Sequence, residues 1–188
     1  MINRFIRFLL LFLLGITFLQ QDKVYAWGWG THRYINENAV DYLPPEMDFF
    51  QEHSAYLREH STDPDVDDLP GYYHYIDIDY YPEFFEGTFP HDWDEAVEQY
   101  GYDVITDNGT IPWVIETWTD SLTVLMASGQ WEAVWQLAAE LGHYVADSHQ
   151  PLHLTLNYNG QLTGNYGIHS RYETHMINPH LSELPLPD

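Results

Sequence analysis

Apolar residues recur every three or four positions along most of the chain, which is the period of a helix that buries one face. Proline and glycine interrupt this pattern where helices are expected to end. Residues 72–78 are expected to form a short extended run, too short to build a sheet. Helices are predicted over residues 32–43, 46–60, 93–100, 112–127, 130–148 and 168–178.

The segments between these helices are predicted to be loops: residues 61–73, which are acidic, residues 80–91, and residues 152–167, which are rich in glycine and asparagine. The chain has no repeat, low-complexity tract or interdomain linker. These features predict one all-α domain over residues 27–188, a compact helical bundle with long loops. The positions expected to face its core are Ile35, Ala39 and Leu43 in the first helix and Val134, Leu137, Ala138, Leu141 and Val145 in the fifth.

Residues 1–26 have the pattern of a secretory signal peptide. Arg4 and Arg7 form a basic start, residues 8–19 are apolar, and a small residue, Ala26, ends a cleavage site. The apolar run is short for a membrane-spanning helix. We therefore expect a secreted or periplasmic protein whose mature chain begins at Trp27.

The chain is strongly acidic, with 29 Asp and Glu residues against 6 Lys and Arg residues and a formal charge of −23. Residues 1–26 carry a net charge of +2, so the mature chain has a charge of −25. Such a surface repels long polyanions and anionic membranes. The chain also lacks cysteine, so a transition metal would need histidine, carboxylate or backbone ligands.

Two pairs of potential metal ligands lie four residues apart on predicted helices. His143 precedes Asp147, and His169 precedes Glu173. Residues at this spacing project from the same face of a helix. His153 follows Asp147 just beyond a proline, where the chain can turn back toward that face. Converging imidazole and carboxylate groups are typical zinc ligands.

Upstream of these helices, Asp63 in the acidic loop and His74 just after it are further potential ligands. Aspartates at every second position, from Asp63 onward, also resemble the start of a calcium-binding EF-hand loop. That loop requires glycine at its sixth position and glutamate at its twelfth, and Asp68 and His74 stand there instead. The sequence therefore does not support an EF-hand.

Trp27 would carry the free amino terminus after cleavage. Its amine and carbonyl oxygen could chelate a metal together with His32. The alternative is that Trp27 and Trp29 only pack into the core.

Together these residues resemble the zinc-dependent phospholipase C and single-strand-specific nuclease superfamily, whose members are trinuclear zinc phosphodiesterases. The resemblance covers nearly all of the mature chain and implies an all-α fold with about three zinc ions. The residues that match the family pattern, in order, are Trp27, His32, Asp63, His74, His143, Asp147, His153, His169 and Glu173.

The resemblance also implies how the ligands divide among the ions. Asp63, His74, His143 and Asp147 would hold one zinc. His153, His169 and Glu173 would hold a second, and the Trp27 terminus, His32 and Asp147 a third, so that Asp147 bridges two ions. Catalysis would use metal-activated water, with Asp63 orienting or deprotonating it and Asp147 holding two metals.

The substrate is less well defined by the sequence. Residues 149–153 and 164–165 favour a nuclease that cleaves single-stranded DNA or RNA, whereas Glu173 favours a phospholipase C, the alternative. A further alternative is a zinc-binding protein without turnover. No stable protein partner is indicated, and we expect a monomer. Because 15 residues follow Glu173 where family members continue through further helices, we expect a truncated C-terminus.

Overall fold

The computed structural model of the chain describes residues 27–184. The predicted signal peptide and residues 185–188 lie outside this part. The described residues form helices and no strand, which confirms the all-α prediction. None of these helices combines the length and apolar character needed to cross a bilayer.

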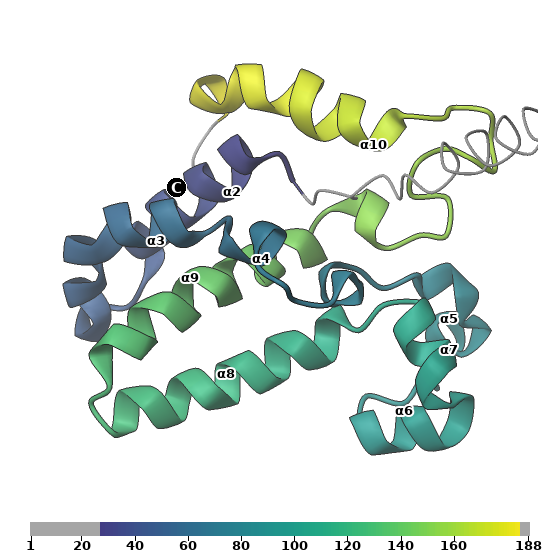
Figure 1. Cartoon of the computed structure of the whole chain (residues 1–188), viewed down its shortest axis with the longest axis horizontal. Coiled ribbons are helices and arrows are strands. Elements are labelled where there is room, and N and C mark those ends of the chain that lie inside the picture. The colour runs from purple at the N-terminus through teal and green to yellow at the C-terminus, as the bar shows by residue number, and fades with distance from the viewer. Residues whose placement is uncertain (1–26, 185–188) are drawn as a thin grey trace, which may run out of the picture.

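The helices follow one another with short connections, except for a long loop before the last group (Figure 1). The elements of the first half are α2 (Trp29–Ala39), η1 (Val40–Tyr42), η2 (Pro45–His53), α3 (Ser54–His60), α4 (Asp63–Val66), η3 (Gly71–His74), η4 (Ile78–Tyr80) and α5 (Pro82–Glu86). Those of the second half are α6 (Trp93–Tyr100), α7 (Tyr102–Asp107), α8 (Ile111–Ala127), α9 (Trp131–Ser148), η5 (Pro151–His153), α10 (Ile168–Ser170), η6 (Arg171–Ile177, a π-helix) and η7 (Asn178–Glu183).

Helix α9 is the element around which the others pack. It runs antiparallel to α8 after a tight turn and also contacts α2, α3 and η3 (Figure 1). Gly129 in the turn has a φ of +69°, a conformation that glycine adopts without strain. Because α9 contacts so many elements, side chains along it can meet residues from distant parts of the sequence.

Two apolar clusters stabilise this arrangement, and α9 contributes to both. Val134 and Ala139, near its start, pack in one cluster with η1, η2 and α3. Tyr144, nearer its end, packs in the other with α6, α7 and the start of α8. The apolar core therefore holds α9 along most of its length.

The predicted core-facing positions were partly wrong. In α9, Val134 is buried but Val145 is exposed, while His143 and Asp147 are fully buried. In α2, Ala39 is exposed and His32 is buried. Apolar spacing therefore identified these helices but not their buried faces, because those faces carry polar residues.

Several boundaries also differ from the prediction. The prediction of an extended run over residues 72–78 is wrong, because residues 72–74 belong to the 3-10 helix η3. The loops expected over residues 61–73 and 80–91 contain the short helices α4 and α5. Helix α7 was not predicted at all.

Gly142 permits the close approach of α9 to α2. A Cβ atom at this position would overlap the side-chain oxygen of Asn36, which is buried. Asn36 cannot easily withdraw, because its side-chain amide donates a hydrogen bond to the Ala139 carbonyl at 3.2 Å. The helix interface therefore requires glycine directly before His143.

We expect Gly142→Ala to destabilise the mature protein, since overpacking a tight contact costs about 1–3 kcal/mol. Thermal unfolding should show a Tm several degrees lower. Gly71→Ala is the control, because nothing lies within 4 Å of a Cβ placed there. Equal Tm values for the two variants would show that α2 and α9 do not need the small residue.

Candidate metal centre

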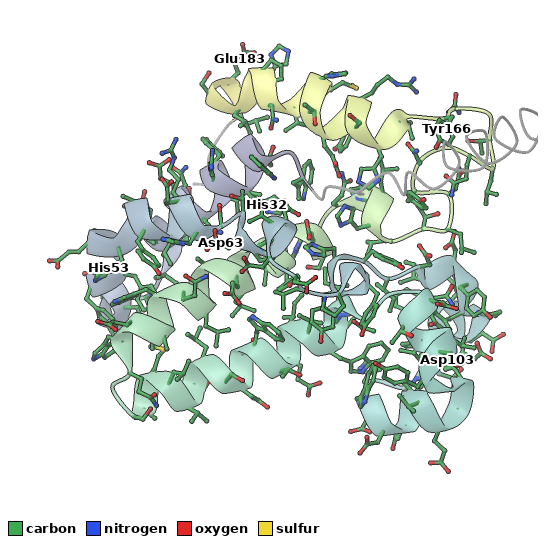
Figure 2. All side chains as sticks on the ribbon, in the orientation of Figure 1. His32, His53, Asp63, Asp103, Tyr166 and Glu183 are labelled. Atoms are coloured by element: carbon green, nitrogen blue, oxygen red, sulfur yellow. The ribbon has the colours of Figure 1, made fainter. Side chains whose placement is uncertain are left out.

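The C-terminal half of α9 is the centre of a buried cluster of imidazoles and carboxylates. Its other members come from α2, α4, η3, η5, α10 and η6, so the cluster joins both halves of the chain. Figure 2 shows His32 in the interior between these elements. The members form three candidate metal-binding groups, and the ligand atoms of each group lie within 4.8 Å of one another: His32, His143 and Asp147; Asp65, His74 and His143; and His153, His169 and Glu173.

The group around His74 brings four side chains together. The Nδ1 atom of His74 lies 3.0 Å from His143 Nε2 and 3.0 Å from Asp147 Oδ2. The Oδ1 atom of Asp65 lies 3.7 Å from His143 Nε2 and 4.0 Å from His74 Nδ1. Four side chains thus direct one ligand atom each toward a common point.

Asp147 uses its two oxygens on different sides of the cluster. Oδ2 faces His74 and lies 3.1 Å from His143 Nε2, whereas Oδ1 lies 3.3 Å from His32 Nε2. His143 has only Nε2 to offer, because its Nδ1 bonds to the Ser61 carbonyl. The geometry therefore places His143 with the His74 group, and Asp147 is the residue that can bridge two groups.

The third group is formed by His153, His169 and Glu173. His169 Nε2 lies 2.6 Å from Glu173 Oε1 and 3.2 Å from His153 Nε2. Gln150, which is fully buried, donates a hydrogen bond to the same carboxylate oxygen at 2.6 Å. All the members of this group are buried.

Backbone carbonyls set the tautomers of two histidines. His143 Nδ1 lies 2.7 Å from the Ser61 carbonyl, and His153 Nδ1 lies 2.7 Å from the His74 carbonyl. A carbonyl only accepts, so each Nδ1 carries the proton and each Nε2 has a free lone pair that faces the cluster. This arrangement is how proteins usually orient histidine ligands toward a metal.

The cluster fits metal ions better than it fits a hydrogen-bond network. Two imidazole nitrogens face each other at 3.0 Å in one group and at 3.2 Å in another. Tetrahedral zinc with bonds of about 2.0–2.1 Å separates its nitrogen ligands by about 3.3 Å. The buried atoms that lack a hydrogen bond include His32 Nε2, Asp65 Oδ2, Asp147 Oδ1 and His169 Nδ1. Buried polar atoms without partners are costly, and bound cations would satisfy His32 Nε2 and Asp147 Oδ1.

Burial and mutual charge shift the pKa values in the cluster. Burial, reinforced by the neighbouring His143, lowers the pKa of His32 to about 4, so its imidazole is neutral at neutral pH. Burial alone would raise the pKa of Asp147, but the surrounding histidines outweigh it and hold this pKa well below the ordinary value. A neutral imidazole and an ionised carboxylate are the forms that bind zinc.

Asp63, the predicted ligand of the acidic loop, does not join the cluster. Its Oδ2 lies 2.7 Å from His60 Nδ1 and accepts a hydrogen bond from Gln136 at 3.1 Å (Figure 2). Asp65 stands in the position expected for it. Both carboxylates contact α9, but at different levels: Asp63 bonds to Gln136, whereas Asp65 approaches His143, about two helical turns further along. The sequence contained both aspartates but no signal that chose between them.

Trp27 lies beside the cluster. Its indole Nε1 donates a 2.7 Å hydrogen bond to the carbonyl of Ala146, the residue before Asp147. Its ring also packs near Tyr172 with centroids 5.7 Å apart. The His32 side of Asp147 has fewer side-chain ligands than the His74 side, and Trp27 is held close to it.

Comparison with known proteins agrees with these groups. A family model described as zinc dependent phospholipase C matches residues 31–183. That span contains every member of the three groups and excludes only Trp27 among the predicted ligands. No curated protein and no solved structure matches the chain.

We expect Asp65→Asn to lower the zinc content of the mature protein, because it removes a charge from the His74 group. Asp63→Asn is the matched control, since it changes the same side chain two residues away. Elemental analysis after dialysis should find about one zinc fewer per chain in Asp65→Asn only. A loss confined to Asp63→Asn would restore the assignment made from the sequence.

Proposed function

Because the chain belongs to the zinc-dependent phospholipase C family, we propose that it hydrolyses phospholipids to diacylglycerol and a phosphorylated head group. The observation that carries this proposal is the family match over the whole run from His32 to Glu173, the run that supplies the three buried groups. The match favours the phospholipase alternative over the nuclease-like prediction from the sequence.

Three zinc ions are proposed, one for each group. Asp65, His74, His143 and the Oδ2 of Asp147 would hold the first. His153, His169 and Glu173 would hold the second. His32 and the Oδ1 of Asp147 would hold the third together with the amine and carbonyl of Trp27. This assignment follows the sequence prediction except that Asp65 replaces Asp63.

Zinc in these groups would supply Lewis-acid activation of water and would neutralise charge on a phosphate. The protein keeps the ligands ready for this chemistry. The Ser61 and His74 carbonyls hold the Nε2 atoms of His143 and His153 toward the cluster. Gln150 donates to one oxygen of Glu173 and so fixes the orientation of that carboxylate.

Charge makes substrate binding depend on the metals. The cluster contains the carboxylates of Asp65, Asp147 and Glu173, in a chain with a formal charge of −23. A phosphodiester anion would be repelled from such a site. Divalent cations bound by these residues would reverse the local charge.

The mature protein, beginning at Trp27, should release diacylglycerol from phosphatidylcholine in the presence of zinc. Chelation should abolish the release and added zinc should restore it, because zinc would activate the attacking water and neutralise the charge of the phosphate. Mass spectrometry of the lipid products measures this. His53→Ala is a suitable control, since His53 stacks on Trp135 away from the cluster.

Parallel incubations with single-stranded DNA distinguish the alternatives. Nucleotide release without diacylglycerol would contradict the phospholipase proposal and favour the nuclease. Zinc binding with neither product would favour the zinc-binding protein without turnover.

A second expectation concerns the amino terminus. A free amine binds zinc well once it loses its proton, whereas a peptide nitrogen does not. Protein with one extra residue before Trp27 should hold about one zinc fewer and hydrolyse lipid much more slowly. Elemental analysis of two otherwise identical proteins, one beginning at Trp27 and one with an added Met, measures the difference. Equal zinc content and equal rates would mean that Trp27 only packs.

A further inference from the structure

The loop between η5 and α10, residues 154–167, differs in charge from the rest of this acidic chain. We call it the neutral loop. No Asp or Glu occurs between Asp147 and Glu173, although the chain contains 29 of them. The nearest charged side chain after the loop is Arg171, one of the few cations of the chain.

The neutral loop exposes large apolar side chains. Leu162 is 70% exposed and Tyr166 is 65% exposed, and Leu156 and Tyr158 are also accessible to solvent. Figure 2 shows Tyr166 at the edge of the molecule. Phe85 on α5, which is also exposed, has Glu86 beside it in sequence. Exposed apolar side chains that gather in one segment are typical of contact surfaces.

The loop satisfies its polar groups internally. The Asn157 side chain accepts a 2.8 Å hydrogen bond from the Leu162 amide and donates one to Thr163 Oγ1 at 3.1 Å. The Gln161 side chain donates to the Leu156 carbonyl at 2.6 Å and accepts from the Asn159 amide. The loop therefore presents Leu162 from a preorganised frame, which reduces the entropy lost on binding.

Contacts at both ends connect the neutral loop to the metal centre. It begins directly after His153 and ends directly before Ile168 and His169. The rings of Tyr158 and His169 lie 6.0 Å apart. The Asp79 carboxylate accepts hydrogen bonds from Thr155 Oγ1 and the Leu156 amide, so its charge is engaged by the start of the loop.

At the other end, the Arg171 guanidinium donates to the carbonyls of Asn165 and Tyr166. The loop with its exposed apolar residues is therefore held beside the group of His153, His169 and Glu173.

We propose that the neutral loop docks on a zwitterionic lipid surface and inserts Leu162 among the lipids. The proposal rests on the proposed phospholipase function. Apolar side chains gain free energy when they leave water for the acyl region, and tyrosine is favourable at the interface. The acidic remainder of the chain would be repelled by anionic lipids, whereas an uncharged loop meets no such barrier on a zwitterionic surface. Docking there would bring the head group to the His153, His169 and Glu173 group.

The test measures flotation of the zinc-loaded mature protein with vesicles of a phosphatidylcholine analogue. In this analogue a methylene replaces the glycerol oxygen at phosphorus, so the lipid cannot be cleaved. Leu162→Glu should weaken binding about tenfold or more, because it removes a buried leucine and adds a charge. Leu162→Trp should bind at least as tightly as the native protein, since tryptophan is favourable at the interface.

Val124→Glu is the matched control, because Val124 is 65% exposed near the end of α8 that turns into α9, opposite the ligand-bearing end of α9. Its binding should stay within about twofold of the native protein, the change expected for a surface substitution. Equal weakening by both glutamates, or no vesicle binding by the native protein, would overturn the proposal. Retention of vesicle binding with loss of single-stranded DNA binding in Leu162→Glu would overturn it in favour of a nucleic-acid surface.

Hydrolysis of a short-chain phosphatidylcholine below its micellar concentration separates this proposal from the proposed function. Leu162→Glu should cleave this monomeric substrate at the native rate, while its rate on ordinary phosphatidylcholine vesicles falls in parallel with binding. Equal rates on vesicles for Leu162→Glu and Val124→Glu would contradict the proposal. Failure of the native protein to cleave the monomeric lipid would instead contradict the phospholipase function.

Discussion

The burial of one carboxylate, that of Asp147, is the constraint on which the rest of the structure depends. An ionised carboxylate in the interior is strongly unfavourable unless charges or donors compensate it. Asp147 is completely buried, and its two oxygens face His32 on one side and His74 and His143 on the other. These residues come from elements far apart in the sequence, so the chain must fold around the end of α9 to bring them together. Divalent cations between these side chains would complete the compensation that the histidines begin.

The same constraint explains what the sequence could and could not predict. Helix periodicity located α8 and α9 closely, because their apolar residues follow the helical repeat over many turns. It misplaced the buried faces, because the polar residues His143 and Asp147 of the candidate metal centre face inward while Val145 is exposed. The residues expected from their spacing to converge, His143, Asp147, His153, His169 and Glu173, all lie in the buried groups, and their role as metal ligands stays a prediction. The structure places Asp65, and not Asp63, in one of these groups, because the outcome depends on where the short helix α4 packs along α9, which is a tertiary property.

Charge connects the metal centre to the proposed substrate and to the neutral loop. The chain has a formal charge of −23, so a phosphate is expected to approach where cations are bound or where carboxylates are absent. The family match and the three buried groups support the first condition. The stretch from Ser148 to Tyr172 provides the second, since it contains no carboxylate and is flanked by ligands at both ends. We therefore propose that the lipid substrate reaches the site beside the neutral loop. The acidic remainder of the chain would repel its phosphate elsewhere.

A crystal structure of the mature, zinc-loaded protein with anomalous diffraction at the zinc edge tests the central claim most directly. The account predicts three anomalous peaks: one among Asp65, His74 and His143, one between His32 and Asp147, and one among His153, His169 and Glu173. It predicts no peak at Asp63. A single peak, or peaks coordinated by Asp63 with Asp147 unliganded, would contradict the assignment of the buried cluster as a metal centre bridged by Asp147.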